Sequence, residues 1–300
     1  MVLYPVLTEL IFRASRILAP SKSWLGTVGA DKAWKQKEPL KGKVVWMHCA
    51  SLGEFEMGKP ILEGFLDNNP NWSGVVTFFS PSGYEPRKNY SRATVHYLPL
   101  DAPSEVSKWL KYCNPSLAVF VRYDLWPNHI AGLKRSNIPT VVIGMSALKT
   151  PWYLNPLLPF IRSTFKAAVN IWGVVEDTDA ATMSAAGIHS VVLGNPKYDY
   201  ASSLTALSVP EKFQRWAAKQ EQPILLVGSA HEMDAVVMAQ TDYSGYSVWL
   251  VPHDLKEASK LSDAFQGKVS DSLSDEPRAT DTLLIPEFGV LRSLYRLAAA

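Results

Sequence analysis

The sequence is poor in cysteine: among its 300 residues only Cys49 and Cys113 are present. Both lie in or beside apolar runs, so we expect buried, reduced thiols of the kind found in cytosolic proteins. No cluster of cysteine and histidine has the spacing of a metal site. We therefore expect a protein without a bound metal.

Several nucleotide and nucleophile motifs are also missing. The sequence has no P-loop and no dinucleotide-binding glycine pattern, which argues against ATP and NAD as ligands, and no cofactor is expected. It has no G-x-S-x-G nucleophile elbow, which disfavours hydrolases. Its 30 basic and 28 acidic residues nearly cancel to a net charge of +2, so the charge gives no reason to expect nucleic acid as a partner.

No apolar run is long enough to span a membrane. Residues 2–19 form one apolar helical stripe, but Glu9, Arg13 and Arg16 interrupt it before the roughly 20 apolar residues that a span needs. No signal-peptide cleavage pattern is present. The helix either packs on the protein's own core or lies in a membrane interface. Residues 1–43 contain eight Lys or Arg and three acids, and this excess favours the interface.

The remaining chain alternates apolar strands with amphipathic helices, which predicts an α/β fold with parallel sheets. The first such unit is a buried strand from Val44, a turn of small residues, and a helix from Glu54. A stretch of small and hydroxyl residues at 200–210 suits a linker. We predict two Rossmann-like lobes, 41–205 and 206–300, after an N-terminal segment 1–40. The strands expected in the first lobe are 44–47, 75–79, 95–98, 117–121, 140–143, 171–175 and 191–193.

The second lobe is predicted to be incomplete. Only three strands are expected, at 224–227, 248–251 and 282–285, whereas doubly wound lobes usually have five or six. The last expected helix, 290–299, has an apolar face that lacks partners. We therefore expect a chain that stops within its second lobe.

Polar residues that follow predicted strands are the candidate site residues, because ligands of doubly wound folds bind beyond the carboxyl ends of the strands. In the first lobe, Glu54 follows the small-residue turn that contains Ser51 and Gly53. Glu54 is either a catalytic acid or base at the crevice, or a helix-start acid that stabilises the helix dipole. Three groups of residues are the remaining candidates of this lobe. Ser80, Ser82 and Gly83 have a turn as their alternative, and Arg122 and Asp124 have a surface ion pair as theirs. Asn195 and Lys197 follow the last strand of the lobe.

In the second lobe, a glycine turn opens a helix at Gly228, Ser229, His231 and Glu232, and suits a phosphate. Pro252 and His253 follow the next strand in the same way. The alternative for both histidines is an ordinary surface residue at the start of a helix.

Taken together, eight segments resemble the 3-deoxy-D-manno-octulosonic acid (Kdo) transferases of lipopolysaccharide synthesis. The resemblance runs from about Leu3 to the last residue. Its segments, in order along the chain, are WMHCASLGEFE, FFSPSGYE, YLPLDAP, VRYDLWPN, IPTVVIGMSAL, VVLGNPKYD, VGSAHE and DTLLIPEFGVLRSLYRLA.

The resemblance implies a two-lobed glycosyltransferase of the GT-B type. It would transfer Kdo from CMP-Kdo to a lipid A precursor, with inversion and without a metal. It would act at the cytoplasmic face of the bacterial inner membrane, with its N-terminal segment on that membrane. The general base of the family falls on Glu54, in the SxGE motif, and the other acid of the first lobe falls on Asp124.

The chain departs from the family pattern at three places. Many members have glutamate at the positions of Arg122 and Asp124, and arginine at the position of His253. The family's glycine-rich segment with His and Asn would follow Ala300, so we expect this chain to bind CMP-Kdo poorly. Two alternatives stay open: another nucleotide-sugar transferase of the same fold, and an inactive membrane-peripheral homologue that binds lipid.

Overall fold

The computed structural model describes residues 3–18, 33–146, 151–204, 208–238, 240–264, 269–272, 282–287 and 289–299. The predicted basic stretch around Lys22, Trp24 and Lys32 lies outside these residues. The chain divides into two compact units, Met1–Tyr200 and Ala201–Ala300, and each is described by itself.

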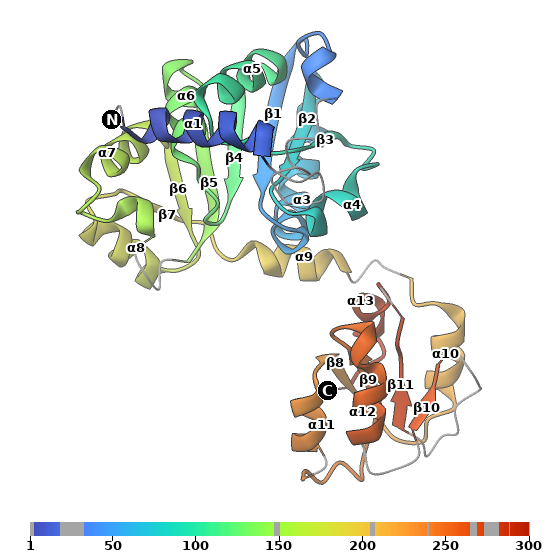
Figure 1. Cartoon of the computed structure of the whole chain (residues 1–300). Helices are drawn as coiled ribbons and strands as arrows, with labels where there is room; N and C mark the ends of the chain where they lie inside the picture. The colour runs from blue at the N-terminus through green and yellow to red at the C-terminus, as the bar shows by residue number, and fades with distance from the viewer. Residues whose placement is uncertain are drawn as a thin grey trace. The chain divides into compact units, whose positions relative to one another are not determined.

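The first unit is built on a seven-stranded parallel sheet with the strand order β3-β2-β1-β4-β5-β6-β7 (Figure 1). The seven strands that the sequence predicts are all present. The order reverses between β1 and β4, and in open α/β sheets this switch point opens a crevice at the carboxyl ends of the strands. The strands are β1 (Lys43–Cys49), β2 (Trp72–Phe78), β3 (Ala93–Tyr97), β4 (Leu117–Val121), β5 (Thr140–Met145), β6 (Ile171–Val174) and β7 (Val191–Val192).

Helices connect these strands, and most of them begin with proline. Proline suits the first position of a helix because its fixed φ is helical and its missing N–H has no intrahelical partner there. The helices with a proline first are α4 (Pro81–Arg87), α5 (Pro103–Cys113), α6 (Pro127–Arg135), α7 (Pro159–Ala168) and α9 (Pro196–Leu204). The others are α1 (Leu3–Leu18), α3 (Leu52–Asn68), α8 (Asp177–Ala185) and the short 3-10 turns η1 (Ala33–Gln36) and η2 (Trp152–Leu154).

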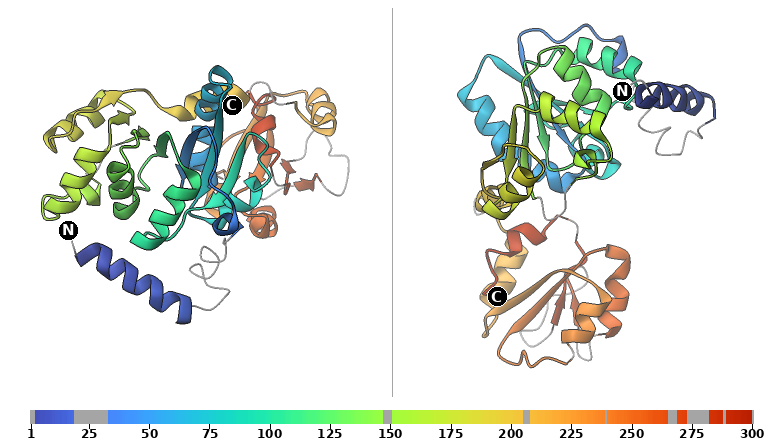
Figure 2. Two further views of the ribbon diagram at one scale, coloured as in Figure 1. Left: turned by 90° about the horizontal axis from the view of Figure 1, so that it is seen from above. Right: turned by 90° about the vertical axis from the view of Figure 1, so that its left-hand side faces the viewer.

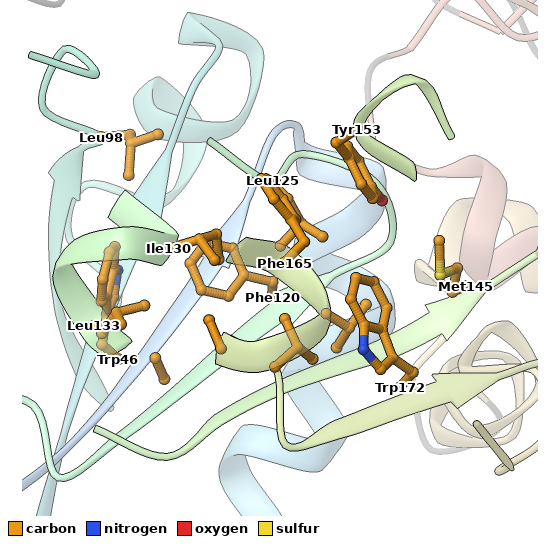
Figure 3. Packing of buried hydrophobic residues seen from close by; sticks show 14 of the residues in the cluster. Trp46, Leu98, Phe120, Leu125, Ile130, Leu133, Met145, Tyr153, Phe165 and Trp172 are labelled. Atoms are coloured by element: carbon orange, nitrogen blue, oxygen red, sulfur yellow. The ribbon is translucent and has the colours of Figure 1, made fainter. Parts of the chain in front are cut away.

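Two apolar cores cover the two faces of this sheet. Side chains alternate along a strand, so Val44 and Trp46 of β1 enter one core, whereas Val45 and Met47 enter the other. The first core is rich in aromatic rings, and Figure 3 shows Trp46, Phe120, Tyr153, Phe165 and Trp172 among its members. The apolar runs of the sequence are therefore continuous because these strands are buried on both faces.

Helix α1 contacts the first unit through polar side chains and lies beside α5 and α6 (Figures 1 and 2). The Tyr4 hydroxyl donates to Asp101 Oδ2 at 2.9 Å, and the Ser104 hydroxyl donates to Glu9 Oε1 at 2.9 Å. Of the side chains described in this helix, the apolar ones are exposed by 47% to 59%: Val6, Leu7, Leu10 and Ile11. The helix thus binds the protein with its polar side and presents apolar residues outward.

The second unit is built on a four-stranded parallel sheet with the order β10-β11-β9-β8. The strands are β8 (Ile224–Ala230), β9 (Ser247–Pro252), β10 (Val269–Asp271) and β11 (Thr282–Leu284). Its helical elements are α10 (Glu211–Ala218), α11 (Glu232–Met238), η3 (Leu255–Glu257), α12 (Ala258–Ala264) and α13 (Leu291–Leu294).

Three details of the sequence prediction are wrong here. Strand β10 was not predicted, because three residues are too few to show a pattern. Part of the expected linker is helical, since α9 continues to Leu204. The last helix is only α13, and its apolar side chains do have partners: Leu294 is buried, and Leu291 and Leu297 pack on the same core. Beyond α13 the chain turns back to the sheet, where the Ala299 amide donates to the Ile224 carbonyl.

Candidate active site

The switch point of the first sheet brings the segment after β1 next to the segment after β4. These two strands pair in parallel, so their carboxyl ends lie at one edge. Glu54 is in the first turn of α3, and its Oε2 accepts a short hydrogen bond from the Ala50 amide. This bond turns the carboxylate back toward the end of β1. The structure therefore places the Glu54 carboxylate beside the carboxyl end of β1, at the switch point of the sheet.

Burial raises the pKa of the Glu54 carboxyl above its ordinary value. The hydrogen bond from Ala50 and the electrostatic influence of His48 and Arg122 act in the opposite direction, whereas the like charge of Asp124 adds to the rise. The net effect is a carboxylate with a higher affinity for a proton than an exposed glutamate. This is the property that a general base working near neutral pH requires.

Asp124 is held by a chain of hydrogen bonds that runs through β1 and β2. The Trp46 indole N–H donates to Thr77 Oγ1 at 2.9 Å, since an indole can only donate. His48 Nδ1 lies 2.9 Å from Thr77 Oγ1 and 3.1 Å from the Thr77 carbonyl oxygen. His48 Nε2 in turn lies 2.9 Å from Asp124 Oδ2.

The two carboxylates consequently differ in their proton affinity. Burial acts to raise the pKa of Asp124, but the hydrogen bond and charge of His48 outweigh it and lower this pKa below its ordinary value. As the pH falls, Glu54 is therefore protonated before Asp124 is. Two neighbouring carboxyl groups whose environments separate their pKa values are a common arrangement for acid–base catalysis.

Arg122 follows β4 directly and lies within electrostatic reach of Glu54. The sequence left open an ion pair between Arg122 and Asp124. That alternative is wrong for the described residues, because Asp124 pairs with His48 and no ion pair of Arg122 with a described acid is formed. The backbone of Arg122 has a φ of +67°, in the left-handed region.

The segment after β2 joins the same edge, since the Ser80 amide donates to the Ala50 carbonyl at 2.9 Å. The hydroxyl of Ser80 caps α4 by accepting from the Ser82 amide, and the two hydroxyls lie 2.9 Å apart. Gly83 is buried, and a Cβ there would lie 2.2 Å from the Phe78 ring. These residues thus have structural roles that a turn and a helix cap explain.

Gly53, by contrast, is exposed beside Ser51, and an added Cβ would meet only the Ser51 hydroxyl, at 4.0 Å. The backbone at Gly53 is therefore accessible next to Glu54. Ser51 makes no hydrogen bond from its side chain to the start of α3, so its hydroxyl is not engaged as a helix cap.

Asn195 and Lys197 follow β7, and the chain there turns back across the carboxyl edge of the sheet. A Cβ at Gly144 of β5 would lie 3.2 Å from the ring of Pro196, which stands between them. Asn195 Oδ1 accepts from the Lys197 amide at 3.1 Å and so caps α9, and the Lys197 side chain is exposed. The amide of Asn195 therefore has a structural role at the start of α9.

In the second unit, the predicted residues do meet at one edge, where β8 and β9 end. The rings of His231 and His253 lie with their centroids 4.5 Å apart, and His231 Nδ1 lies 3.3 Å from Glu257 Oε2. Both histidines and Glu232 are exposed, whereas Pro252 is buried.

The glycine turn before these histidines has a structural explanation as well. A Cβ at Gly228 would lie 2.8 Å from Leu291 and 2.9 Å from the Tyr295 hydroxyl, so close packing requires glycine there. Ser229 has a φ of +56°. Within the described part of the chain, no group of three or more His, Cys, Asp or Glu side chains is arranged to hold a metal ion.

Sequence reasoning did not find Trp46, His48 and Thr77 as parts of the site. A signal was present, because His48 is a titratable residue inside an apolar strand. Its meaning depends on the β1–β2 register, which pairs His48 with Thr77. Nothing in the local sequence fixes that register.

The family model of 3-deoxy-D-manno-octulosonic-acid transferase (kdotransferase) matches residues 22–200. The 3-deoxy-D-manno-octulosonic acid transferase of Chlamydia pneumoniae is 26% identical over 280 residues, which are 87% of this chain and 63% of that protein. The enzyme of the same name from Chlamydophila psittaci is 29% identical over 288 residues, which are 88% of this chain and 64% of that protein. The chain therefore spans about two thirds of the length of these curated relatives.

Among solved structures, the UDP-GlcNAc 2-epimerase of Neisseria meningitidis bound to UDP-GlcNAc is similar with a TM-score of 0.57 at 13% identity. The similarity covers 84% of this chain and 74% of the epimerase. At this identity the likeness concerns the fold alone. It confirms the predicted α/β architecture with two Rossmann-like lobes.

Proposed function

The chain belongs to the 3-deoxy-D-manno-octulosonic-acid transferase family, and from this premise we propose that it is a glycosyltransferase that moves Kdo from CMP-Kdo to a lipid A precursor. The observation that carries the proposal is the pair of carboxylates at the switch point. Glu54 is the general base and Asp124 is its ionised neighbour.

In the proposed reaction, a hydroxyl of the acceptor attacks the anomeric carbon of Kdo, and the bond from this carbon to the CMP phosphate breaks. Glu54 takes the hydroxyl proton as the new bond forms, because a neutral hydroxyl is a weak nucleophile. Attack opposite the leaving group inverts the anomeric carbon. Asp124 supports this step, because its like charge raises the pKa of Glu54.

CMP leaves as a phosphate monoester, and the increase of negative charge on it needs stabilisation. We assign this role to the second unit, where the amides of Gly228 and Ser229 and the imidazoles of His231 and His253 lie at one sheet edge. No metal is part of the proposed reaction. Transfer in the presence of EDTA is accordingly expected to equal transfer in its absence.

The test is Kdo transfer to a lipid A precursor by Glu54→Gln. The amide keeps the shape and can still accept the hydrogen bond from Ala50, but it cannot take a proton. We expect a loss of transfer of about 100-fold or more, the usual range for a general base. The matched control is Glu85→Gln, since Glu85 is exposed on α4 and pairs only with Lys88 among the described residues.

Transfer by Glu54→Gln at the rate of the unchanged protein would contradict the assignment of the base. If a panel of nucleotide sugars shows transfer from another donor and not from CMP-Kdo, the chain is a transferase that uses that other nucleotide sugar. If no donor supports transfer while the precursor still binds, the chain is the inactive lipid-binding homologue.

We further propose that α1 attaches the protein to the inner membrane at its cytoplasmic face. The support is the apolar face of α1, whose described side chains are about half exposed and continue through Leu7 into a groove of about 480 Å³ beside α7. Leu157 and Phe160 at this groove are exposed by 85% and 64%, and Arg135 supplies a positive charge. Exposed apolar side chains with a basic residue suit a membrane of anionic lipids. Among the described residues, no helix is both long and apolar enough to cross a bilayer.

Flotation with vesicles of phosphatidylethanolamine and phosphatidylglycerol tests the attachment. Leu10→Asp places a charge on the apolar face of α1, and we expect it to reduce the vesicle-bound fraction several-fold, because a charge in an apolar interface is costly. Ile61→Asp is the matched control, since Ile61 is also exposed but lies on α3. Equal flotation of the two variants would reject α1 as the attachment site.

A further inference from the structure

Arg122 has a backbone conformation that glycine would adopt with less strain. Its φ of +67° is in the left-handed region, and its amide donates to the Ile143 carbonyl at 2.9 Å, which fixes it to the neighbouring strand β5. Residues other than glycine occupy this region rarely, and such residues gather at functional sites. A long cationic side chain at this position is therefore not explained by the turn itself.

The guanidinium of Arg122 is oriented but not neutralised. It lies over the Tyr123 ring at 5.5 Å, and the Tyr123 hydroxyl is itself fixed by donating to the Ser146 carbonyl at 2.8 Å. The Nε atom of Arg122 is buried without a hydrogen-bond partner among the described residues. A buried donor without a partner is unfavourable, and in native proteins it points to a group that is absent from the structure.

The two carboxylates of the site do not pair with this guanidinium. Asp124 Oδ2 is bonded to His48 and Glu54 Oε2 accepts from Ala50, and neither residue forms an ion pair with Arg122. The positive charge nevertheless acts on Glu54 and thus belongs to the same edge of the sheet. A substrate group beside Glu54 would therefore meet an oriented, unpaired cation.

We infer that Arg122 binds an oxyanion of the substrate, a carboxylate or a phosphate, next to the hydroxyl that Glu54 deprotonates. Arginine suits such a group because its planar fork of N–H donors matches two oxygens at once. The inference rests on the proposed function, which provides two sources of the oxyanion. One is the carboxylate of the sugar acid that is transferred, and the other is a phosphate on the acceptor sugar.

Isothermal titration of the whole chain with two probes distinguishes these sources. Free 3-deoxy-D-manno-octulosonate provides the carboxylate, and glucosamine 1-phosphate provides the phosphate. We expect one of them to bind at millimolar concentration, and the tighter one identifies the source. Arg122→Gln and Arg122→Gly should weaken that binding by about tenfold or more, as expected for the loss of a charged hydrogen bond.

Arg92→Gln is the control for charge alone, because Arg92 is exposed directly before β3, at the opposite end of the strands from the site. We expect its affinity to equal that of the unchanged chain. Arg122→Gly also controls for folding: glycine relieves the positive φ, so its melting temperature should not fall. A variant that stays folded and loses the probe shows a binding role.

The inference is overturned if the unchanged chain binds neither probe, if both Arg122 variants bind as well as it does, or if Arg92→Gln loses as much affinity. The titration needs no transfer reaction, so its outcome is separate from that of the Glu54 test. If Glu54→Gln still transfers, Glu54 is not the general base. If neither probe binds in the titration, only the role of Arg122 is rejected.

Discussion

The two sheets of this protein carry polar residues at their carboxyl edges in different ways. At the edge of β1 and β4, His48 is 1% exposed and is hydrogen-bonded to Asp124, and the pKa values of Asp124 and Glu54 are shifted in opposite directions. At the edge of β8 and β9, His231 and His253 are exposed, and their tilted rings lie against each other. The first edge thus fixes its carboxylates by hydrogen bonds, whereas the histidines of the second edge face solvent.

The largest expected effect on stability comes from replacing His48 at the first edge, with the replacement of His231 at the second edge as the comparison. His48→Ala leaves a cavity and removes the partner of both Asp124 and Thr77, so we expect the free energy of unfolding to fall by about 3 kcal/mol. His231→Ala removes an exposed ring and should change it by less than about 0.5 kcal/mol. Denaturant unfolding monitored by circular dichroism measures both. Equal losses would remove the contrast between the edges.

A smaller effect on stability is expected from removing the hydroxyl of Thr77, which links Trp46 to His48. Thr77→Val keeps the shape of the side chain but leaves the indole N–H and His48 Nδ1 without this partner, at a cost of about 1–2 kcal/mol in the free energy of unfolding. The control is Thr94→Val on β3, whose side chain is exposed. If Thr77→Val is as stable as this control, the hydrogen-bonded chain does not fix His48.

The smallest effect has the opposite sign and concerns Glu54. A carboxyl whose pKa is raised by folding binds its proton more tightly in the folded state, so its ionisation destabilises the fold as the pH increases. Glu54→Gln removes this effect. We expect the variant to be slightly more stable than the unchanged protein at neutral pH, with the difference vanishing as the pH falls below the ordinary pKa of glutamate.

Thermal unfolding of both proteins across the acidic to neutral range measures this difference. A variant that gains stability and loses transfer would indicate that Glu54 is kept for chemistry. A difference that grows toward acidic pH would contradict the raised pKa of Glu54. The second edge offers no such test, since its ionisable candidate residues, His231, Glu232 and His253, are exposed.

Much of the fold could be predicted from the sequence, because strands buried on both faces leave long apolar runs and parallel strands require intervening helices. Strand β10 and the true extent of α13 could not, since three or four residues carry too weak a pattern. For the site, the position of Glu54 after a strand was readable. The direction of its carboxylate could not be predicted, because it depends on the bond from the Ala50 amide.

Tertiary packing also decides where the segment after β7 lies. Asn195 and Lys197 follow β7, four positions from β1 in the strand order, but Pro196 between them packs against Gly144 of β5. Likewise, His48 and Thr77 are 29 residues apart and meet only through the register of two parallel strands. Strand order and register are set by packing of whole elements and leave no local trace.

By itself, the sequence determined the α/β class, the family and the amphipathic character of the first helix, because these follow from periodicity and motifs along the chain. Only the tertiary structure decided which side of α1 contacts the protein, and which residues share the edge with Glu54. The physical reason is that hydrogen bonds between distant residues, such as that of Tyr4 with Asp101 and that of His48 with Asp124, form only once the elements have packed.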